Sequence, residues 1–480
     1  MKRSSRKHRG RFLIALAAAA FGIATLAALP QEGHAAASSS YGETPDIVII
    51  LTDDQRVGLL DAMPTVRNSI IAQGVNYTQA MVPTSVCCPS RASILTGMYS
   101  HSTGVWHNGD KTAISGVPGG YDAFVANGNE SRTVAVALDQ AGYQTEMIGK
   151  YLNGYLQQYG PPPGWDRFLA FDKEAAYYDY MLGGQLHGSR ARDYSTDVIA
   201  RKAVTLIQTA PTAQPLFMYI APKAPHAPFI PAPRDVGAPM DQYVHPRDFG
   251  AFNEANLSDK PAWLQNKSPV SLQRMHELAR AQHRSLLAVD ELTGNVIDAL
   301  KARGTLSNTL LIFMSDNGLQ WGEHRLTKKD LPYTASTRIP MAMRWDGHIA
   351  PGTTRTDLVL NVDIAPTIAD VVGVTMPGTE GFSLLSPNQR TGFPIEGTVG
   401  KPLDHGTAQR PAYCGWRTAT QLFVHYSGGQ EELYLLDQDP NETHNVASDT
   451  AFESVLNDLR NQTQQKCVPV PPMFSWQSTN

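Results

Sequence analysis

Two apolar runs of the chain end in short groups of oxygen-bearing side chains. Residues 47–51 lead into Thr52-Asp53-Asp54, and residues 310–314 lead into Ser315-Asp316-Asn317-Gly318. Carboxylate and amide oxygens are the ligands that Ca²⁺ and Mg²⁺ prefer, and no cluster of His or thiolate ligands competes. Taken singly, each group is also typical of a turn or a helix cap. Because ligands bind beyond the carboxyl ends of strands in open α/β sheets, the pair indicates a cation site, with two turns as the alternative.

The sequence reads Cys87-Cys88-Pro89-Ser90-Arg91 and continues Ala92-Ser93-Ile94-Leu95-Thr96-Gly97. Neighbouring cysteines rarely meet disulfide geometry, so Cys87 and Cys88 need another role. A buried Cys pair at a helix start would explain neither the Pro nor the Arg. The pattern Cys-x-Pro-x-Arg with these trailing residues resembles the sulfatase motif. That resemblance implies that Cys87 is oxidised to formylglycine by a formylglycine-generating enzyme.

The resemblance to type I sulfatases of the alkaline-phosphatase-like superfamily extends from about Pro45 to about Asp449. Four further segments are similar to family motifs: Gly142-Tyr143-Gln144-Thr145 with Gly149-Lys150, Ala224-Pro225-His226-Ala227-Pro228-Phe229, Gly322-Glu323-His324 with Lys329, and Glu432-Leu433-Tyr434 through Asp439-Pro440-Asn441-Glu442 to Asn445. The family fold is an alkaline-phosphatase-like α/β/α sandwich with a mostly parallel central sheet. A small C-terminal domain with a short antiparallel sheet accompanies it.

The resemblance implies a metal-assisted, covalent mechanism. A hydroxyl of the aldehyde hydrate binds the cation, attacks sulfur and forms a sulfate ester, and loss of a proton from the second hydroxyl then expels sulfate. The implied metal ligands are Asp53, Asp54, Asp316, Asn317 and the modified Cys87. We expect Ca²⁺ rather than Mg²⁺, from the family and from the number of oxygen ligands.

Four basic residues complete the implied catalytic site. Arg91 would orient the hydrate and offset negative charge. Lys150 and Lys329 would stabilise the charged sulfuryl oxygens. His226 would donate a proton to the leaving oxygen or bind a sulfate oxygen.

Three basic positions in family-like segments allow alternatives. Lys329 is chosen over Lys328 because it lies four residues before Tyr333, where the family usually has a Lys before a Tyr. His101 and His324 are either in catalytic contact or in a supporting or packing position, and the sequence does not distinguish these roles.

The clearest departure from the family is Lys150-Tyr151-Leu152, where many members have a His two positions after the Lys. Leu152 cannot bind sulfate or move a proton. The form Gly-Lys-Tyr-Leu-Asn, with the doubled Cys before Pro, is similar to sulfatases that act on the 6-sulfate of glucosamine. Asn153 and His107 are candidates for the missing contact, and the substrate is either a sulfated sugar or an aryl sulfate.

Two other functions remain as alternatives. A phosphodiesterase or phosphonate monoester hydrolase would use the same fold and nucleophile. A catalytically silent secreted carbohydrate-binding protein would keep the fold alone, but it would not need an oxidisable Cys before Pro.

Strands and helices must alternate to position these residues. Apolar runs at 47–51, 216–220 and 310–314 are interspersed with helical patterns at 133–140 and 271–302. This order predicts an α/β fold with a largely parallel sheet. The Pro-rich segment 221–259 is expected to form a long loop region over one end of that sheet, where loops are usually functional.

Composition divides the chain into four parts. Residues 1–36 read as a signal peptide, 45–375 as the catalytic domain, 376–402 as a Gly- and Pro-rich linker and 403–475 as a small C-terminal subdomain. Basic residues before an apolar run and an Ala cluster indicate a cleaved leader rather than a retained anchor. We therefore expect a secreted, bacterial protein without stable membrane insertion.

Charge and cysteine usage narrow the class further. The formal net charge is −4, so net charge gives no support for nucleic acid as a partner. Four cysteines exclude a disulfide scaffold, although Cys414 and Cys467 could form one bridge in an oxidising compartment.

Overall fold

The computed structural model describes residues 43–109, 116–244, 250–387, 390–400 and 409–476. The predicted signal peptide lies outside the described residues. Within the described ranges, no helix combines the length and the apolar character needed to cross a membrane.

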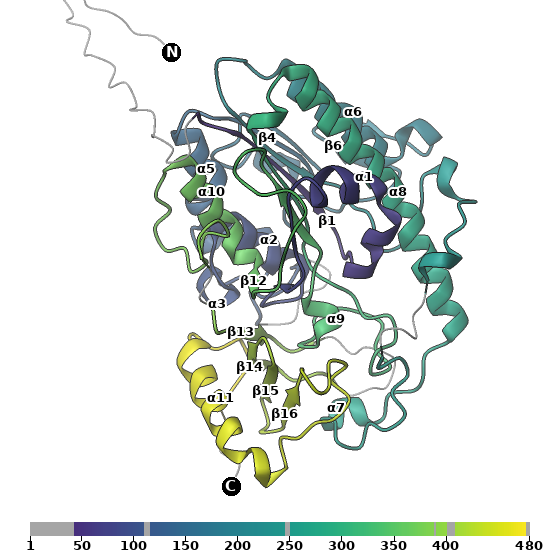
Figure 1. Ribbon diagram of the computed structural model, residues 1–480, viewed down its shortest axis with the longest axis vertical. Helices are drawn as coiled ribbons and strands as arrows, with labels where there is room; N and C mark the ends of the chain where they lie inside the picture. The colour runs from purple at the N-terminus through teal and green to yellow at the C-terminus, as the bar shows by residue number, and fades with distance from the viewer. Residues whose placement is uncertain (1–42, 110–115, 245–249, 388–389, 401–408, 477–480) are drawn as a thin grey trace, which may run out of the picture. The chain divides into compact units, whose positions relative to one another are not determined.

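A central eight-stranded sheet carries the fold (Figure 1), with the strand order β11-β2-β10-β9-β1-β8-β4-β5. Its strands are β1 (Asp46–Thr52), β2 (Val75–Tyr77), β4 (Gln144–Gly149), β5 (Arg167–Ala170), β8 (Leu216–Ala221), β9 (Thr309–Ser315), β10 (Met341–Arg344) and β11 (Thr353–Arg355). The five strands from β9 to β5 are parallel neighbours, and β10 is antiparallel to both of its neighbours. The predicted mostly parallel sheet is confirmed.

Helices cover both faces of the sheet. Successive side chains of a strand point to opposite sides, so each central strand contributes to a core on either face. On β1, Ile47, Ile49 and Leu51 belong to one core cluster, whereas Val48 and Ile50 belong to another. The first cluster includes residues of α2 (Cys87–Thr96), α5 (Val134–Gln140) and α10 (Ile364–Val372), and the second includes residues of α6 (Ser195–Thr209) and α8 (Leu272–Arg303). Figure 1 shows these two helix groups on opposite sides of the sheet.

The two helices expected from the sequence are present, and each begins at a side-chain cap. Thr133 accepts a hydrogen bond from the backbone N–H of Val136 at the start of α5. Ser271 accepts one from Arg274 at the start of α8. Such caps satisfy backbone donors that have no partner within the helix.

A second sheet follows near the C-terminus. It is antiparallel, in the order β13-β14-β15-β16, with α11 after it. Its elements are β13 (Gly392–Gly397), β14 (Tyr413–Thr418), β15 (Gln421–Tyr426), β16 (Glu431–Leu435) and α11 (Glu453–Lys466). β13 begins inside the segment 376–402 that we assigned to a linker, and the domain boundaries stay a prediction.

The remaining elements are short. They include the paired strands β3 (Ala80–Met81) with β12 (Val359–Leu360) and β6 (Tyr180–Leu182) with β7 (Gln185–His187), and the helices α1 (Pro64–Val66), α3 (Ser100–Thr103), α4 (Gly120–Ala126), α7 (Ala262–Gln265) and α9 (Thr334–Thr337).

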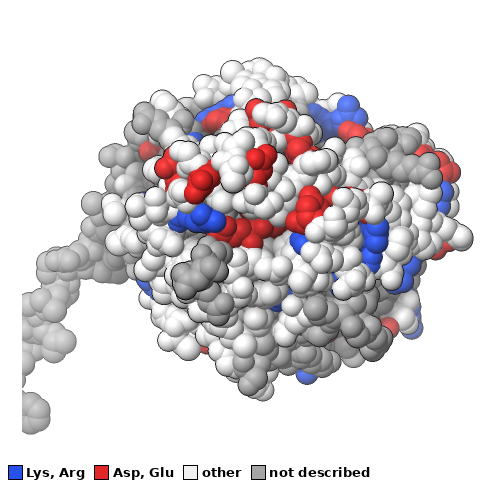
Figure 2. All heavy atoms as spheres, turned by 90° about the horizontal axis from the view of Figure 1, so that it is seen from below, with Lys and Arg blue, Asp and Glu red and all other residues white. Residues whose placement is uncertain are grey.

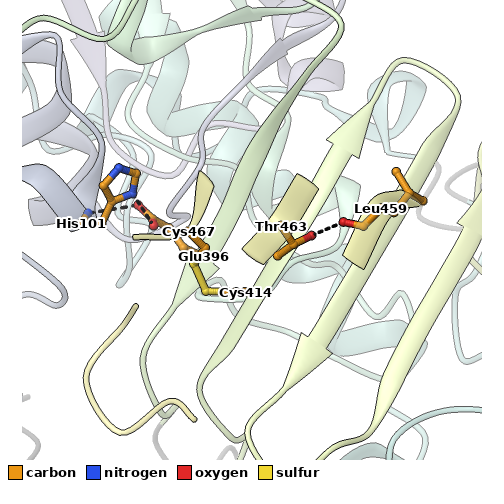
Figure 3. The surroundings of a disulfide bond; sticks show 6 residues. All are labelled: His101, Glu396, Cys414, Leu459, Thr463 and Cys467. Atoms are coloured by element: carbon orange, nitrogen blue, oxygen red, sulfur yellow. Dashed lines mark hydrogen bonds and ion pairs between the residues drawn. A yellow bond between two sulfur atoms is a disulfide. The ribbon is translucent and has the colours of Figure 1, made fainter. Parts of the chain in front are cut away.

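One disulfide joins Cys414 of β14 to Cys467, directly after α11 (Figure 3). The bond fastens this helix end to the small sheet. Near it, His101 of α3 lies 2.8 Å from the carboxylate of Glu396 on β13. The pairing that the sequence left open is therefore present.

Candidate active site

Four adjacent parallel strands deliver charged side chains to one edge of the central sheet. Asp53 follows β1, Lys150 follows β4 and Asp316 follows β9. Lys223 and His226 follow β8. Because the carboxyl ends of parallel strands lie at the same edge, residues far apart in the sequence meet here.

Helix α2 brings the Cys-x-Pro-x-Arg motif to this edge. It runs from Cys87 to Thr96, and Gly97 caps its C-terminal end with a φ of 71°. A Cβ at Gly97 would lie 2.8 Å from Cγ2 of Thr379, so glycine suits both the backbone conformation and the space. All ten helical residues are buried, and the backbone N–H of Cys88 donates to Asn108. The motif is therefore enclosed by the surrounding protein.

The Cys87 sulfur faces two carboxylates and one ammonium group. Its Sγ lies 3.2 Å from Asp53 Oδ1, 3.8 Å from Asp54 Oδ1 and 2.6 Å from Lys329 Nζ. Burial, together with Asp316 and Asp53, raises the pKa of Cys87 well above its usual value. Burial likewise raises the pKa of Cys88 to about 12. Unmodified, both are neutral thiols at neutral pH and poor nucleophiles.

The two carboxylates after β1 are held in the ionised form. Lys150 Nζ donates to Asp53 Oδ2 at 2.7 Å, and Lys329 Nζ and Asn317 Nδ2 both contact Asp54 Oδ1. Burial alone would raise both pKa values, but the nearby cations outweigh it, so the pKa of each carboxyl is lowered. Two negative charges therefore face the sulfur.

These side chains fit a divalent cation. One donor atom from each of Asp53, Asp54, Cys87 and His226 lies within 4.8 Å of the others. The Lys329 ammonium already lies in contact with Asp54 and Cys87, so a positive charge is accommodated here. The carboxylate oxygens of Asp53 and Asp54 are the type of donor that a hard metal ion prefers.

Asp316 and Asn317 lie beside this group. Asp316 accepts from the backbone N–H of Asp54 at 3.0 Å and from Arg91 Nε at 2.8 Å. Asn317 Oδ1 lies 3.5 Å from Lys329 Nζ. The structure thus brings both residues to the site, and their role as metal ligands stays a prediction.

Arg91 is fully buried and links two strand ends. Besides its bond to Asp316, its Nη1 donates to the backbone oxygen of Lys150 at 2.7 Å. Its charge offsets that of Asp316, and its role in orienting the hydrate stays a prediction.

His226 points its Nε2 at Asp54 Oδ2, at 3.7 Å. Its Nδ1 lies 2.8 Å from the backbone oxygen of Ala227, and Tyr177 Oη donates to the backbone oxygen of His226 at 2.7 Å. Burial lowers the pKa of His226 although Asp53 and Asp54 oppose this shift. Its ring is thus fixed in place and faces the cluster.

Sequence reasoning missed Lys223 and Tyr177. Lys223 is buried, and its Nζ lies 3.4 Å from His226 Nδ1 and 5.7 Å from the centre of the Tyr177 ring. Burial lowers the pKa of Lys223. Its position three residues before His226 was a usable indication, whereas nothing in the sequence marks Tyr177.

The basic positions left open by the sequence are now placed. Lys329 lies in the cluster, whereas the Lys328 side chain is exposed. His101 contacts Glu396, and His324 contacts Glu254 at 2.6 Å. Both histidines therefore contact carboxylates, and their part in catalysis stays a prediction.

Leu152 packs in the apolar core on one side of the sheet. Its side chain therefore does not supply the contact that the family His would make at the site. Of the two candidates for that contact, His107 lines the cavity described next. Its Nδ1 accepts from the backbone N–H of Gly109, and its Nε2 lies 2.7 Å from the backbone oxygen of Val117. Which group replaces the family His stays a prediction.

A cavity of about 880 Å³ opens onto the cluster. Asp54, His226 and Lys329 belong to its lining. The walls are largely apolar with several basic side chains, among them Phe229, Val270, Met275, Leu278, Leu319, Val399, Arg274, Arg325, Lys328 and Arg410. This volume is in the range of pockets that bind small ligands.

Residues 45–374 match the family model described as Sulfatase, and residues 322–468 match one described as N-sulphoglucosamine sulphohydrolase, C-terminal. The chain is 33% identical over 364 residues to human N-acetylglucosamine-6-sulfatase, covering 71% of this chain and 64% of the relative. It is 32% identical over 404 residues to an arylsulfatase of Volvox carteri, covering 76% of this chain and 59% of the relative. The chain thus spans less than two thirds of the length of these curated relatives.

Solved structures share the fold. One is a protein in complex with its substrate D-glucosamine-2-N,6-O-disulfate, with a TM-score of 0.70 at 23% identity, covering 88% of this chain and 97% of that one. Another is the phosphonate monoester hydrolase of Agrobacterium radiobacter, with a TM-score of 0.68 at 19% identity, covering 88% and 95%. At these identities the likeness concerns the fold alone.

Proposed function

This chain belongs to the sulfatase family, and from that premise we propose that it hydrolyses sulfate esters of sugars, using formylglycine formed at position 87 and a bound Ca²⁺ ion. The observation that carries the proposal is the position of Cys87. It begins a buried helix, faces Asp53 and Asp54, and contacts Lys329 at a cavity that can hold a sugar.

A sugar substrate is supported by three observations. The human relative that matches 71% of this chain is an N-acetylglucosamine-6-sulfatase. The sequence Gly149-Lys150-Tyr151-Leu152-Asn153 is similar to glucosamine sulfatases. The cavity, at about 880 Å³, is larger than a sulfate group alone would need.

The chain's own residues bind the sulfuryl group and balance its charge. When bound, the cation and the position-87 aldehyde would supply an activated oxygen nucleophile. Lys329 and His226, in the cavity lining, are placed to bind sulfate oxygens. Lys150 offsets the charge of Asp53, and Arg91 that of Asp316. Positive groups placed in this way stabilise the negative charge of the sulfuryl group.

We also propose that the protein is exported. The basic and apolar residues 1–36 support a cleaved leader, and the disulfide between Cys414 and Cys467 suits an oxidising compartment. N-terminal sequencing of protein from the culture medium should begin near residue 36, and a retained leader would contradict this.

Mass spectrometry of the peptide that spans Cys87, combined with an arylsulfatase assay, tests the catalytic proposal. We expect the aldehyde at position 87 in active protein. Cys87→Ala should abolish turnover, whereas Cys88→Ala should still form the aldehyde, because Cys88 packs in the apolar core. An unmodified thiol in fully active protein would overturn the proposal.

A phosphonate monoester hydrolase is the second candidate, since such an enzyme shares this fold with a TM-score of 0.68. We expect a sulfatase to turn over 4-nitrophenyl sulfate faster than phenyl 4-nitrophenyl phosphonate. The reverse order, measured on the aldehyde-bearing protein, would favour the phosphonate hydrolase.

A further inference from the structure

Two basic side chains on the cavity wall lack an acidic partner among the described residues. Arg274 lies in the first turn of α8, and Lys328 directly precedes Lys329. Both side chains are exposed, and neither makes an ion pair or a side-chain hydrogen bond within the described ranges.

The other Lys and Arg side chains on this wall already contact groups of the protein. Lys329 contacts Asp54, and Arg410 lies 2.9 Å from Asp330. Arg325 donates to three backbone oxygens, those of Glu254, Ala255 and Lys267. Among the described residues of the wall, Arg274 and Lys328 are therefore the Lys and Arg side chains without a contact to a protein group.

Both cations share the cavity with apolar side chains. Val270, Met275 and Leu278 belong to the same lining, so a sugar bound there would contact apolar surface as well as the two charges. Two like charges in one cleft raise the local concentration of oppositely charged ligands. The cavity thus offers a positive region besides the reaction centre at Cys87.

The outer surface offers less attraction to an anion on the face that Figure 2 shows. There, Asp and Glu side chains gather in a band, and Lys and Arg lie scattered around it.

We propose that Arg274 and Lys328 form a second anion subsite, which binds a negatively charged group of the sugar other than the sulfate ester that is cleaved. This rests on the proposed sulfatase activity and narrows its substrate class. The preferred substrates carry at least two negative groups, the second being a sulfate or a carboxylate. Arg274 supplies a planar guanidinium, which pairs well with either group.

The test compares two substrates on matched variants. N-acetylglucosamine 6-sulfate and D-glucosamine-2-N,6-O-disulfate differ by one negative charge, because the N-acetyl group is neutral. We expect the ratio of kcat/KM for the disulfate over the monosulfate to fall about 3-fold in Arg274→Gln and in Lys328→Gln, and about 10-fold in the double variant. Lys301→Gln is the control, because Lys301 lies on the same helix but pairs with Asp298 and does not line the cavity.

The dissociation constants of both sugars for the Cys87→Ala protein, measured by calorimetry, separate the two proposals. If no sulfate ester is hydrolysed, the proposed function fails, but the binding preference still decides on the subsite. An unchanged preference in the double variant would overturn the subsite. An equal loss in Lys301→Gln would do the same, because it would show a general charge effect.

Discussion

Charged side chains at the edge of the central sheet are buried in pairs of opposite sign. Lys150 pairs with Asp53, Lys329 with Asp54 and Arg91 with Asp316. A buried charge is tolerated only when it is paired and hydrogen-bonded. The cluster is therefore stable as a set, and the loss of one member leaves its partner uncompensated.

Replacement of Lys329 with Gln tests this arrangement. The variant removes a positive charge from the sulfate site and frees Asp54, so we expect kcat/KM for 4-nitrophenyl sulfate to fall about 100- to 1000-fold. Steady-state kinetics and a thermal denaturation midpoint are both needed. A folded variant that retains more than about a tenth of the activity would refute the assigned role.

Residues marked by a motif could be predicted, whereas residues brought in by packing could not. Asp53, Cys87 and Lys150 stand in recognisable patterns, and the structure places all three together. Tyr177 meets His226 only because segments 49 positions apart fold onto one another, whereas Lys223 lies just three residues before His226. No local pattern records such long-range contacts.

At the scale of elements, the small C-terminal sheet fixes the segment that carries Lys329. Tyr333 donates its hydroxyl to Glu432 of β16 at 2.9 Å, and Tyr426 and Tyr434 donate to the same buried carboxylate. The family-like segment that begins at Glu432 thus has a structural role. It anchors a residue four positions after Lys329.

Removal of single hydroxyls from this carboxylate separates stability from positioning. Tyr333→Phe and Tyr426→Phe each delete one donor to Glu432, and each should lower the free energy of unfolding by about 1 to 2 kcal/mol. Only Tyr333→Phe should also lower kcat/KM, because only Tyr333 lies on the segment of Lys329. Equal activity of the two variants would argue against this anchoring.

The longest helix and the central strands were predicted, whereas the helices α6 and α11 and several short strands were not. The helix expected at 271–302 is α8 (Leu272–Arg303), and the strand expected at 47–51 is β1. The strands β2 and β10 were not anticipated. β2 has three residues, and it pairs with β10, more than 250 positions later in the chain. Such short segments carry too little periodicity, and distant pairing decides their structure.

At the scale of the whole molecule, the two sheets are joined by polar contacts of His101. Its ring lies between Glu396 of β13, at 2.8 Å, and Glu380, at 3.4 Å. Burial would lower the pKa of His101, but the two carboxylates outweigh it and raise the pKa from 6.5 to about 10. The protonated ring thus links α3 to the C-terminal sheet.

This contact should make stability depend on pH. Because the folded pKa of His101 exceeds its unfolded value, its contribution is fully present below pH 6.5 and is lost as the pH rises toward about 10. At about 1.4 kcal/mol per unit, the contribution is at most about 5 kcal/mol. Thermal denaturation between pH 6 and 10 should show a smaller decline in His101→Gln than in the unaltered protein. His276→Gln, on α8, should keep the original decline; a decline equal to that of His101→Gln would refute this assignment.

The burial of the Cys87 motif bears on the order in which the chain is modified and folds. In the folded protein, Cys87 to Arg91 are helical and almost wholly buried. A second protein that must grasp this segment and oxidise Cys87 can reach it only while the segment is still extended. On the proposed function, the chain therefore has to acquire its reactive group before it acquires its fold. A copy that folds first keeps an inert thiol for as long as the native state lasts, so the timing of synthesis determines the active fraction.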